Sequence, residues 1–212
     1  MLPAVASSSK GRPEDSSPKR RAKQHQIIEA AKEVLTRDGL AACTARTVAD
    51  ASPLTKSAIH YYFDDMDEII DGAMTAHLSA FLDHVREAAA RHESPADRFW
   101  AAVRAYLEMF AERPSTALLW FSYWVEAGQK SRIEPIDRMH QDVTAVLRDL
   151  LADIPVDAPT ERAHALFSYL LGTVIQQAVR PLPFPALTPE IATLCHLNAP
   201  HPESNDQQAG PD

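Results

Sequence analysis

Apolar residues recur every three or four positions along most of this chain, which is the spacing of an amphipathic helix. Between residues 24 and 37, Ile27, Ala31 and Val34 would share one face. No stretch alternates apolar and polar residues with the period of a half-buried strand. The pattern predicts an all-α protein. Helices are expected at residues 24–37, 66–92 and 95–112, after Pro114 through the aromatic residues 120–124, and at 133–151, 160–179 and 188–197.

Several helix ends are marked by residues that satisfy free backbone groups. Gly39 follows the first helix, where it would act as a left-handed cap. Asp65 is a predicted N-cap, and Asp67 falls in the first turn, where the helix dipole favours an acid. Ser94 and Pro95 form a similar start signal. These acids are explained by helix structure and need no metal.

Residues 44–63 predict two short helices around a tight corner. The buried positions of this pair would be Val48, Ala49, Leu54, Ala58, Ile59 and Tyr62. The second helix begins with Thr55, Lys56 and Ser57, small or basic donors that can enter a major groove and reach base edges or phosphates. The pattern is that of a helix-turn-helix, and its second helix is the candidate recognition helix.

From about Arg20 to Met74 the chain resembles the amino-terminal domain of the tetracycline-repressor (TetR) family. The matching positions are the basic run Lys19 to Lys23, Gly39, Thr44, Val48-Ala49 and Thr55 to Phe63. The resemblance implies a three-helix DNA-binding domain, joined by a long helix to a helical domain that binds an effector and dimerises. It also implies repression that is relieved when the effector moves the long helix, although the sequence leaves repression and activation both open.

Three positions depart from the family pattern. Pro53 stands where the corner usually has Gly, His60 where the recognition helix usually has Tyr, and Met66 where the next helix usually opens with Lys. Pro has a fixed φ and no N–H, so the corner cannot use a left-handed Gly conformation. The loss of the Tyr and the Lys removes two phosphate contacts that the family usually makes, which bears on DNA affinity.

Four regions are expected along the chain: a disordered arm at 1–18, the DNA-binding domain at 19–74, an effector-binding and dimerisation domain at 75–198, and a disordered tail at 199–212. The run from Lys19 to Lys23 could be a solvated helix start, but beside a helix-turn-helix we favour an arm along the minor groove or phosphates. The residues predicted to contact DNA are Lys19, Arg20, Arg21, Lys23, Thr44, Arg46, Thr55, Lys56, Ser57, Ala58, His60, Tyr61 and Tyr62.

The charge distribution agrees with DNA binding at one end only. Residues 1–63 hold ten Lys and Arg against six acids, a net charge of +4. Because the whole chain has a net charge of −8, residues 64–212 have a net charge of −12. An acidic body with a basic end disfavours nucleic acid wrapped over the whole surface. Binding as a dimer would place two recognition helices about a two-fold axis and so predicts a palindromic operator of double-stranded DNA.

The dimer is expected to form through the helices near 160–180 and 188–197, because the stretch from Thr160 to Val179 is apolar over most of its circumference and must bury more than one face. A small organic effector, apolar or cationic, is expected among the aromatic residues of the body. For each of these residues, ordinary core packing is the alternative. The predicted effector-binding residues are Trp100, Tyr106, Trp120, Tyr123, Trp124, His140 and Phe167.

The segment 119–126 and the Leu-Leu-Gly-Thr at 170–173 are weakly similar to the branch of the family that contains the choline-responsive repressor of the betaine pathway. We expect Cys43 and Cys195 to be reduced and packed rather than redox-active. With no signal peptide and no apolar run of membrane-spanning length, we expect a cytoplasmic protein that does not contact membranes.

No phosphate-binding Gly loop, metalloprotease motif or nucleophile elbow occurs in the sequence, which argues against an enzyme and predicts no catalytic residue, metal or cofactor. The alternative to a DNA-binding regulator is a helical dimer whose DNA binding has been weakened at Pro53, His60 and Met66. Such a protein would act as a module that binds a small molecule or another protein.

Overall fold

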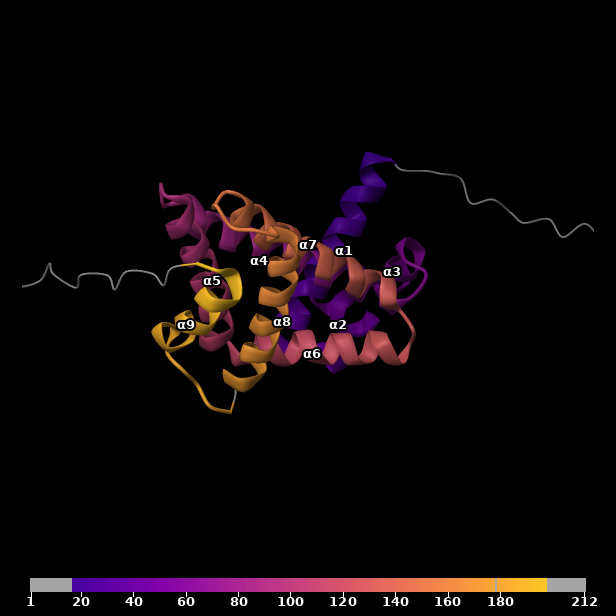
Figure 1. Cartoon of the computed structure of the whole chain (residues 1–212). Helices are drawn as coiled ribbons and strands as arrows, with labels where there is room; N and C mark the ends of the chain where they lie inside the picture. The colour runs from indigo at the N-terminus through magenta and orange to yellow at the C-terminus, as the bar shows by residue number, and fades with distance from the viewer. Residues whose placement is uncertain (1–16, 178, 198–212) are drawn as a thin grey trace, which may run out of the picture.

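The computed structural model describes residues 17–177 and 179–197, and within them the chain forms helices and no strand (Figure 1). The predicted all-α class is confirmed. The segments expected to be disordered, 1–18 and 199–212, lie almost entirely outside the described residues. The helices are α1 (Pro18–Asp38), the 3-10 turn η1 (Leu40–Ala42), α2 (Ala45–Asp50), α3 (Lys56–Tyr62), α4 (Met66–Ala90), α5 (Pro95–Glu112), α6 (Pro114–Gln129), α7 (Ile133–Ala152), α8 (Pro159–Gln177) and α9 (Phe184–Cys195).

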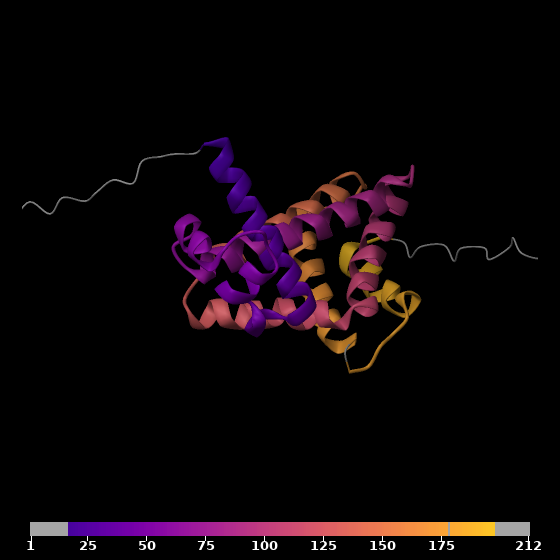
Figure 2. The same ribbon diagram turned by 180° about the vertical axis from the view of Figure 1, so that it is seen from behind.

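The first three α-helices pack around one apolar core. Ile27 and Val34 of α1, Val48 of α2 and Ile59 of α3 are each at most 1% exposed. Helix α1 also lies along α4, and α6 touches α1 and η1 from the carboxy-terminal part of the chain. Figure 2 shows this group of helices at one end of the molecule, with α3 at the outer edge. The core therefore fixes α3 while leaving its other face open to solvent.

The corner between α2 and α3 is built around a residue without an N–H group. The Ser52 amide donates to the Ala49 carbonyl at 3.1 Å, and the Leu54 amide donates to the Ser52 hydroxyl at 3.2 Å. Pro53 lies between them and is exposed. The Ser52 hydroxyl thus closes the turn without a left-handed residue, as expected from a proline at this position.

Four helices begin with a side-chain N-cap, and the caps predicted at Asp65 and Ser94 are among them. In each case a side-chain oxygen accepts a hydrogen bond from the backbone amide three residues later, which satisfies one of the free donors of the first turn. The pairs are Thr44 with Thr47 at 3.3 Å, Thr55 with Ala58 at 3.2 Å, Asp65 with Glu68 at 2.8 Å and Ser94 with Asp97 at 3.1 Å.

Two helices begin earlier than the apolar pattern predicts. Helix α1 starts at Pro18, where Ser17 accepts a hydrogen bond from the Arg20 amide at 3.3 Å, so a cap followed by proline starts the helix in a polar segment. Helix α9 starts at Phe184 with Pro185 in its first turn, and Pro189 lies inside it. The carbonyl of Pro185, which Pro189 cannot satisfy, accepts the Thr188 hydroxyl at 2.9 Å.

Gly39 ends α1 in a conformation that differs from the expected left-handed cap. Its φ of 82° is positive, but its ψ of 178° places it in the extended region of positive φ, which is essentially restricted to glycine. Its amide donates to the Leu35 carbonyl at 3.0 Å. The chain consequently leaves α1 extended and turns at once into η1.

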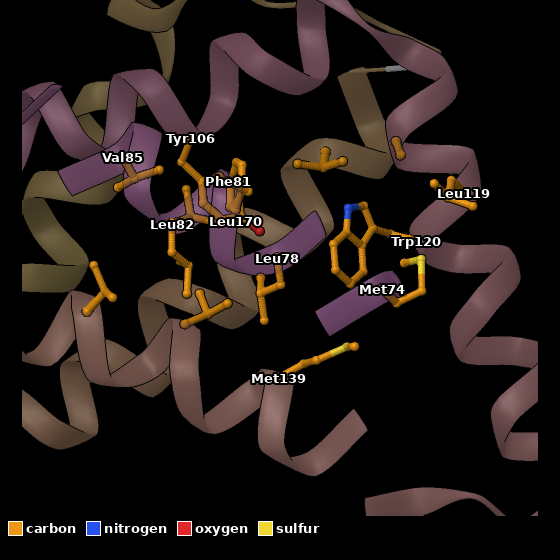
Figure 3. Packing of buried hydrophobic residues seen from close by; sticks show 14 of the residues in the cluster. Met74, Leu78, Phe81, Leu82, Val85, Tyr106, Leu119, Trp120, Met139 and Leu170 are labelled. Atoms are coloured by element: carbon orange, nitrogen blue, oxygen red, sulfur yellow. The ribbon is translucent and has the colours of Figure 1, made fainter. Parts of the chain in front are cut away.

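Helix α4 connects the two parts of the molecule. It packs on α1 of the amino-terminal helices and on α5 and α7 of the body. Figure 3 shows Met74 and Leu78 of α4 near Trp120 of α6 and Met139 of α7, and Phe81 of α4 near Tyr106 of α5. A displacement of α6 or α7 would therefore change the packing of α4, the helix that directly follows α3.

Candidate DNA-binding surface and effector cavity

Helix α3 presents a polar face to solvent. Its N-cap Thr55 and the side chains of Lys56, Ser57, His60 and Tyr61 are exposed, with Tyr61 at 67%, while Ile59 on the opposite face is 1% exposed. Thr44, the N-cap of α2, and Arg46 on α2 are also exposed. Ala58 and Tyr62 of α3 are partly buried. The exposed members of the predicted contact set, Thr55, Lys56, Ser57, His60 and Tyr61, thus lie along the solvent face of α3.

The basic run lies on the first turns of α1 instead of in an extended arm. Lys19 and Arg21 are exposed and Lys23 is partly buried. Arg20 points to α3: its Nη2 donates to the Tyr62 carbonyl at 3.4 Å, and its guanidinium lies 5.6 Å and 5.5 Å from the ring centres of Tyr61 and Tyr62. Arg20 therefore holds the end of the recognition helix in this structure, and its contact with DNA stays a prediction.

A narrow cavity of about 30 Å³ lies among five helices of the body. All five of α4, α5, α6, α7 and α8 contribute side chains, and three of the aromatic rings come from α6. Figure 3 shows part of this wall, with the Trp120 ring near Leu78 and Met74. The lining residues are Leu78, Phe81, Tyr106, Phe110, Trp120, Phe121, Trp124, Met139, Val143, Phe167, Leu171 and Val174.

The wall of this cavity is almost entirely carbon, and none of its described lining residues is charged. Its polar side-chain atoms are the Tyr106 hydroxyl and the two indole nitrogens, together with the weakly polar sulfur of Met139. Burial raises the pKa of Tyr106, so its phenol stays neutral. A volume of this size suits about one water molecule, whereas sites for drug-sized ligands occupy roughly 300–1,000 Å³.

The predicted effector-binding residues fall into two groups. Tyr106, Trp120, Trp124 and Phe167 line the cavity together. The other three lie elsewhere. Trp100 borders a separate surface groove between α4 and α5. The Tyr123 hydroxyl donates a hydrogen bond to Asp71. The His140 and Phe167 rings are in an edge-to-face arrangement, with their centres 5.0 Å apart. Ligand binding by any of the seven stays a prediction.

A polar cluster ties α4 to the end of α6 and the turn before α7. The Tyr123 hydroxyl of α6 donates to Oδ1 of Asp71 at 2.7 Å, and the Arg132 guanidinium pairs with the same carboxylate. Lys130 donates to Asp67, one turn earlier on α4, at 2.7 Å. We call these five residues the α4 clamp.

Charges within the α4 clamp stabilise one another. Burial would lower the pKa of Arg132, but the hydrogen bond and charge of Asp71 outweigh it and raise that pKa. The pKa of Tyr123 is raised by burial and by the hydrogen bond to Asp71. Since Tyr123 is fully buried and lies between the cavity-lining Trp120 and Trp124, the clamp joins the cavity wall to α4.

Sequence reasoning missed the clamp and most of the apolar lining. From the sequence, Asp67 is accounted for by the helix dipole, and Tyr123 is predicted as an effector contact with core packing as the alternative. The available signal was the pair of acids at 67 and 71, one turn apart on a helix whose other face is apolar. Nothing in the sequence indicated that Lys130 and Arg132, more than 60 positions away, would meet them.

The exposed recognition helix on a buried three-helix scaffold defines a DNA-binding transcriptional regulator of the helix-turn-helix class. The family model described as "Bacterial regulatory proteins, tetR family" matches residues 27–73 of the chain. Its relatives are regulators and not enzymes. No helix within the described residues is long and apolar enough to cross a membrane.

Two curated relatives and one solved structure extend the similarity over most of the chain. The regulator PksA of Bacillus subtilis is 26% identical, covering 74% of this chain and 81% of that protein. The regulator BetI of Paraburkholderia xenovorans is 24% identical, covering 78% and 86%. The multidrug binding protein EbrR, solved with imidazole, shares the fold with a TM-score of 0.65 at 21% identity, covering 87% of this chain and 98% of that one.

Proposed function

We propose that this protein is a cytoplasmic, ligand-responsive repressor that binds a palindromic operator as a homodimer and releases it when an effector binds. The observation that carries the proposal is the connection of the exposed helix-turn-helix to the apolar cavity through one helix, α4. Its amino-terminal end follows the recognition helix, and its middle lines the cavity with Leu78 and Phe81. The DNA contacts are those named from the sequence, centred on Lys56 and its exposed neighbours on α3.

Dimerisation through α8 and α9 is supported by an exposed apolar face. Ile175 is 52% exposed, Val179 is 86% exposed and Leu182 is 45% exposed, all at or beyond the end of α8. Large apolar side chains that are exposed close together often mark a protein–protein interface. A two-fold axis through this face relates two copies of α3, and the operator must share that symmetry.

The cavity is too small in this structure to hold an effector. A ligand larger than one water must widen the cavity, and α6 supplies Trp120, Phe121 and Trp124 to its wall. Moving α6 outward also moves Tyr123 and strains its hydrogen bond to Asp71 of α4. The effector thereby favours a different position of α4, and it weakens DNA binding only as far as it prefers that position. EbrR is named a multidrug binding protein, which supports a small-molecule effector. The similarity to BetI does not assign the branch.

The test is an electrophoretic mobility shift with DNA flanking the gene of this protein, in a series of salt concentrations. We expect a specific complex with two protomers per site, with an affinity that falls steeply as salt rises, because each neutralised phosphate adds about 0.9 to the slope of log K against log salt. Equal binding to scrambled DNA, or no dependence on salt, would refute operator binding. It would favour the alternative of a dimer that only binds small molecules or proteins.

A further inference from the structure

Among the residues that line the cavity, Trp124 has a fully buried hydrogen-bond donor without a partner in the described part of the chain. Trp124 of α6 lines the cavity, with its ring edge-on to Phe121 at 5.9 Å. Its Nε1 is buried, and within the described part of the chain no acceptor lies within hydrogen-bonding distance of it. An indole N–H can only donate, so this atom needs an acceptor to be satisfied.

An unpartnered buried donor is destabilising because it loses its hydrogen bond to water, and native proteins keep few of them. Arg132 Nε is also buried without a hydrogen bond, but it belongs to a guanidinium that Asp67 and Asp71 already balance. Trp124 has no such compensation. Its neighbours in the cavity wall are hydrocarbon and aromatic side chains, so an acceptor that reaches Nε1 through the cavity must come from the bound molecule.

We infer that the effector is an uncharged, mostly apolar molecule with one hydrogen-bond acceptor, such as a ketone, ester or ether oxygen, and that Trp124 Nε1 donates to it. This rests on the proposed effector-binding function and gives it a chemical class. The same wall disfavours a cationic effector. No carboxylate is among the described lining residues, and a cation would exchange its hydration shell for aromatic faces alone.

Matched ligands test the acceptor directly. In each pair the ketone and the alkene have the same shape, since a 2-alkanone and the corresponding 2-methyl-1-alkene differ only in C=O against C=CH₂. We would measure dissociation constants by calorimetry with the full-length dimer for pairs of eight to twelve carbons, and for alkyltrimethylammonium ions of similar length. We expect the ketone to bind about tenfold tighter than its alkene, which corresponds to one hydrogen bond of about 1.4 kcal/mol.

A substitution distinguishes the contribution of the indole N–H group to binding from that of the aromatic ring. Trp124→Phe should abolish the preference for the ketone while changing alkene affinity by less than about threefold. The control is Trp100→Phe, which removes an indole N–H at the separate groove between α4 and α5, outside the cavity lining, and should leave the preference intact.

Four results would overturn the inference: equal binding of ketone and alkene by the unsubstituted protein, a preference that survives Trp124→Phe, tighter binding of the ammonium ions, or no binding by any probe. The comparison of ligands needs no variant to fold. If the ketone preference holds but the protein does not bind its operator, the repressor function fails and the ligand class stands.

Discussion

Lys56 is the exposed base at the first position of α3, and it makes no ion pair within the described chain. Lys56→Ala should weaken operator binding and lower the salt slope by about 0.9, the share of one phosphate, because no packing is lost. Fluorescence anisotropy across a salt series measures both quantities, and circular dichroism checks the helices. Arg86→Ala is the control, since Arg86 is an exposed base of α4 paired with Asp83 at 2.9 Å.

If Lys56→Ala weakened binding only at one operator base pair, Lys56 would read a base instead of a phosphate. Unchanged affinity would place the recognition surface elsewhere.

The α4 clamp gives a second prediction for single residues. Asp71→Asn leaves Arg132, whose side chain is 18% exposed, without its closest carboxylate and weakens the acceptor of the Tyr123 hydroxyl. We expect a loss of about 2–3 kcal/mol in the free energy of unfolding, and a smaller effect of effector on DNA affinity. Lys130→Ala, at a pair whose lysine side chain is 44% exposed, should cost less than about 1 kcal/mol. Similar losses in urea unfolding for both variants would contradict this role of burial.

Among the elements, α4 carries a histidine that makes the junction sensitive to acid. Burial lowers the pKa of His77, and the positive charges of Lys32 and Arg113 lower it further. The unfolded imidazole takes up a proton near its ordinary pKa of 6.5 while the folded one resists, so acid favours unfolding. The contribution of His77 to stability is therefore lost as pH falls below about 6.5.

Chemical denaturation of the parent and of His77→Gln at pH 7.5 and pH 5.5 checks this prediction. We expect the variant to lose less stability over that interval than the parent. An equal loss in the two proteins would assign the acid sensitivity to other groups. Because the His77 ring lies 5.6 Å from the Trp120 ring, tryptophan fluorescence should also change over the same range in the parent.

The elements were predictable where their signals are local. Thr44, Thr55, Asp65 and Ser94 cap helices that begin within one residue of them, and a cap needs only its own turn. The early start of α1 is not predicted by apolar periodicity, because its first turn is polar and is set by the Ser17 N-cap and Pro18. The cavity and the α4 clamp depend on side chains from several helices, with Tyr123 and Asp71 separated by 52 positions, and no local pattern encodes such meetings.

For the whole molecule, a substitution can test whether the exposed apolar residues near the end of α8 form the dimer interface. Ile175→Glu should dissociate the dimer, because a carboxylate would be buried without a partner at the α8 face. Operator affinity should then fall by about 10² or more, since each monomer holds only one half-site. Analytical ultracentrifugation and mobility shifts measure the two effects.

Leu118→Glu is the matched control for the dimer. Leu118 lies on α6 and is 69% exposed, so it is at least as accessible as Ile175 but outside the proposed dimer face. It should leave the sedimentation of the dimer unchanged. A monomer produced by Leu118→Glu and not by Ile175→Glu would move the interface to α6.

The small volume of the cavity also sets how quickly the regulator can respond. With room for about one water, the cavity cannot hold an effector in this conformation, so the lining helices must move apart for the ligand to bind. The observed rate of uptake should then rise with effector concentration only up to a plateau, which equals the rate at which the bundle opens. Above that concentration, additional effector would deepen induction at equilibrium without making it faster.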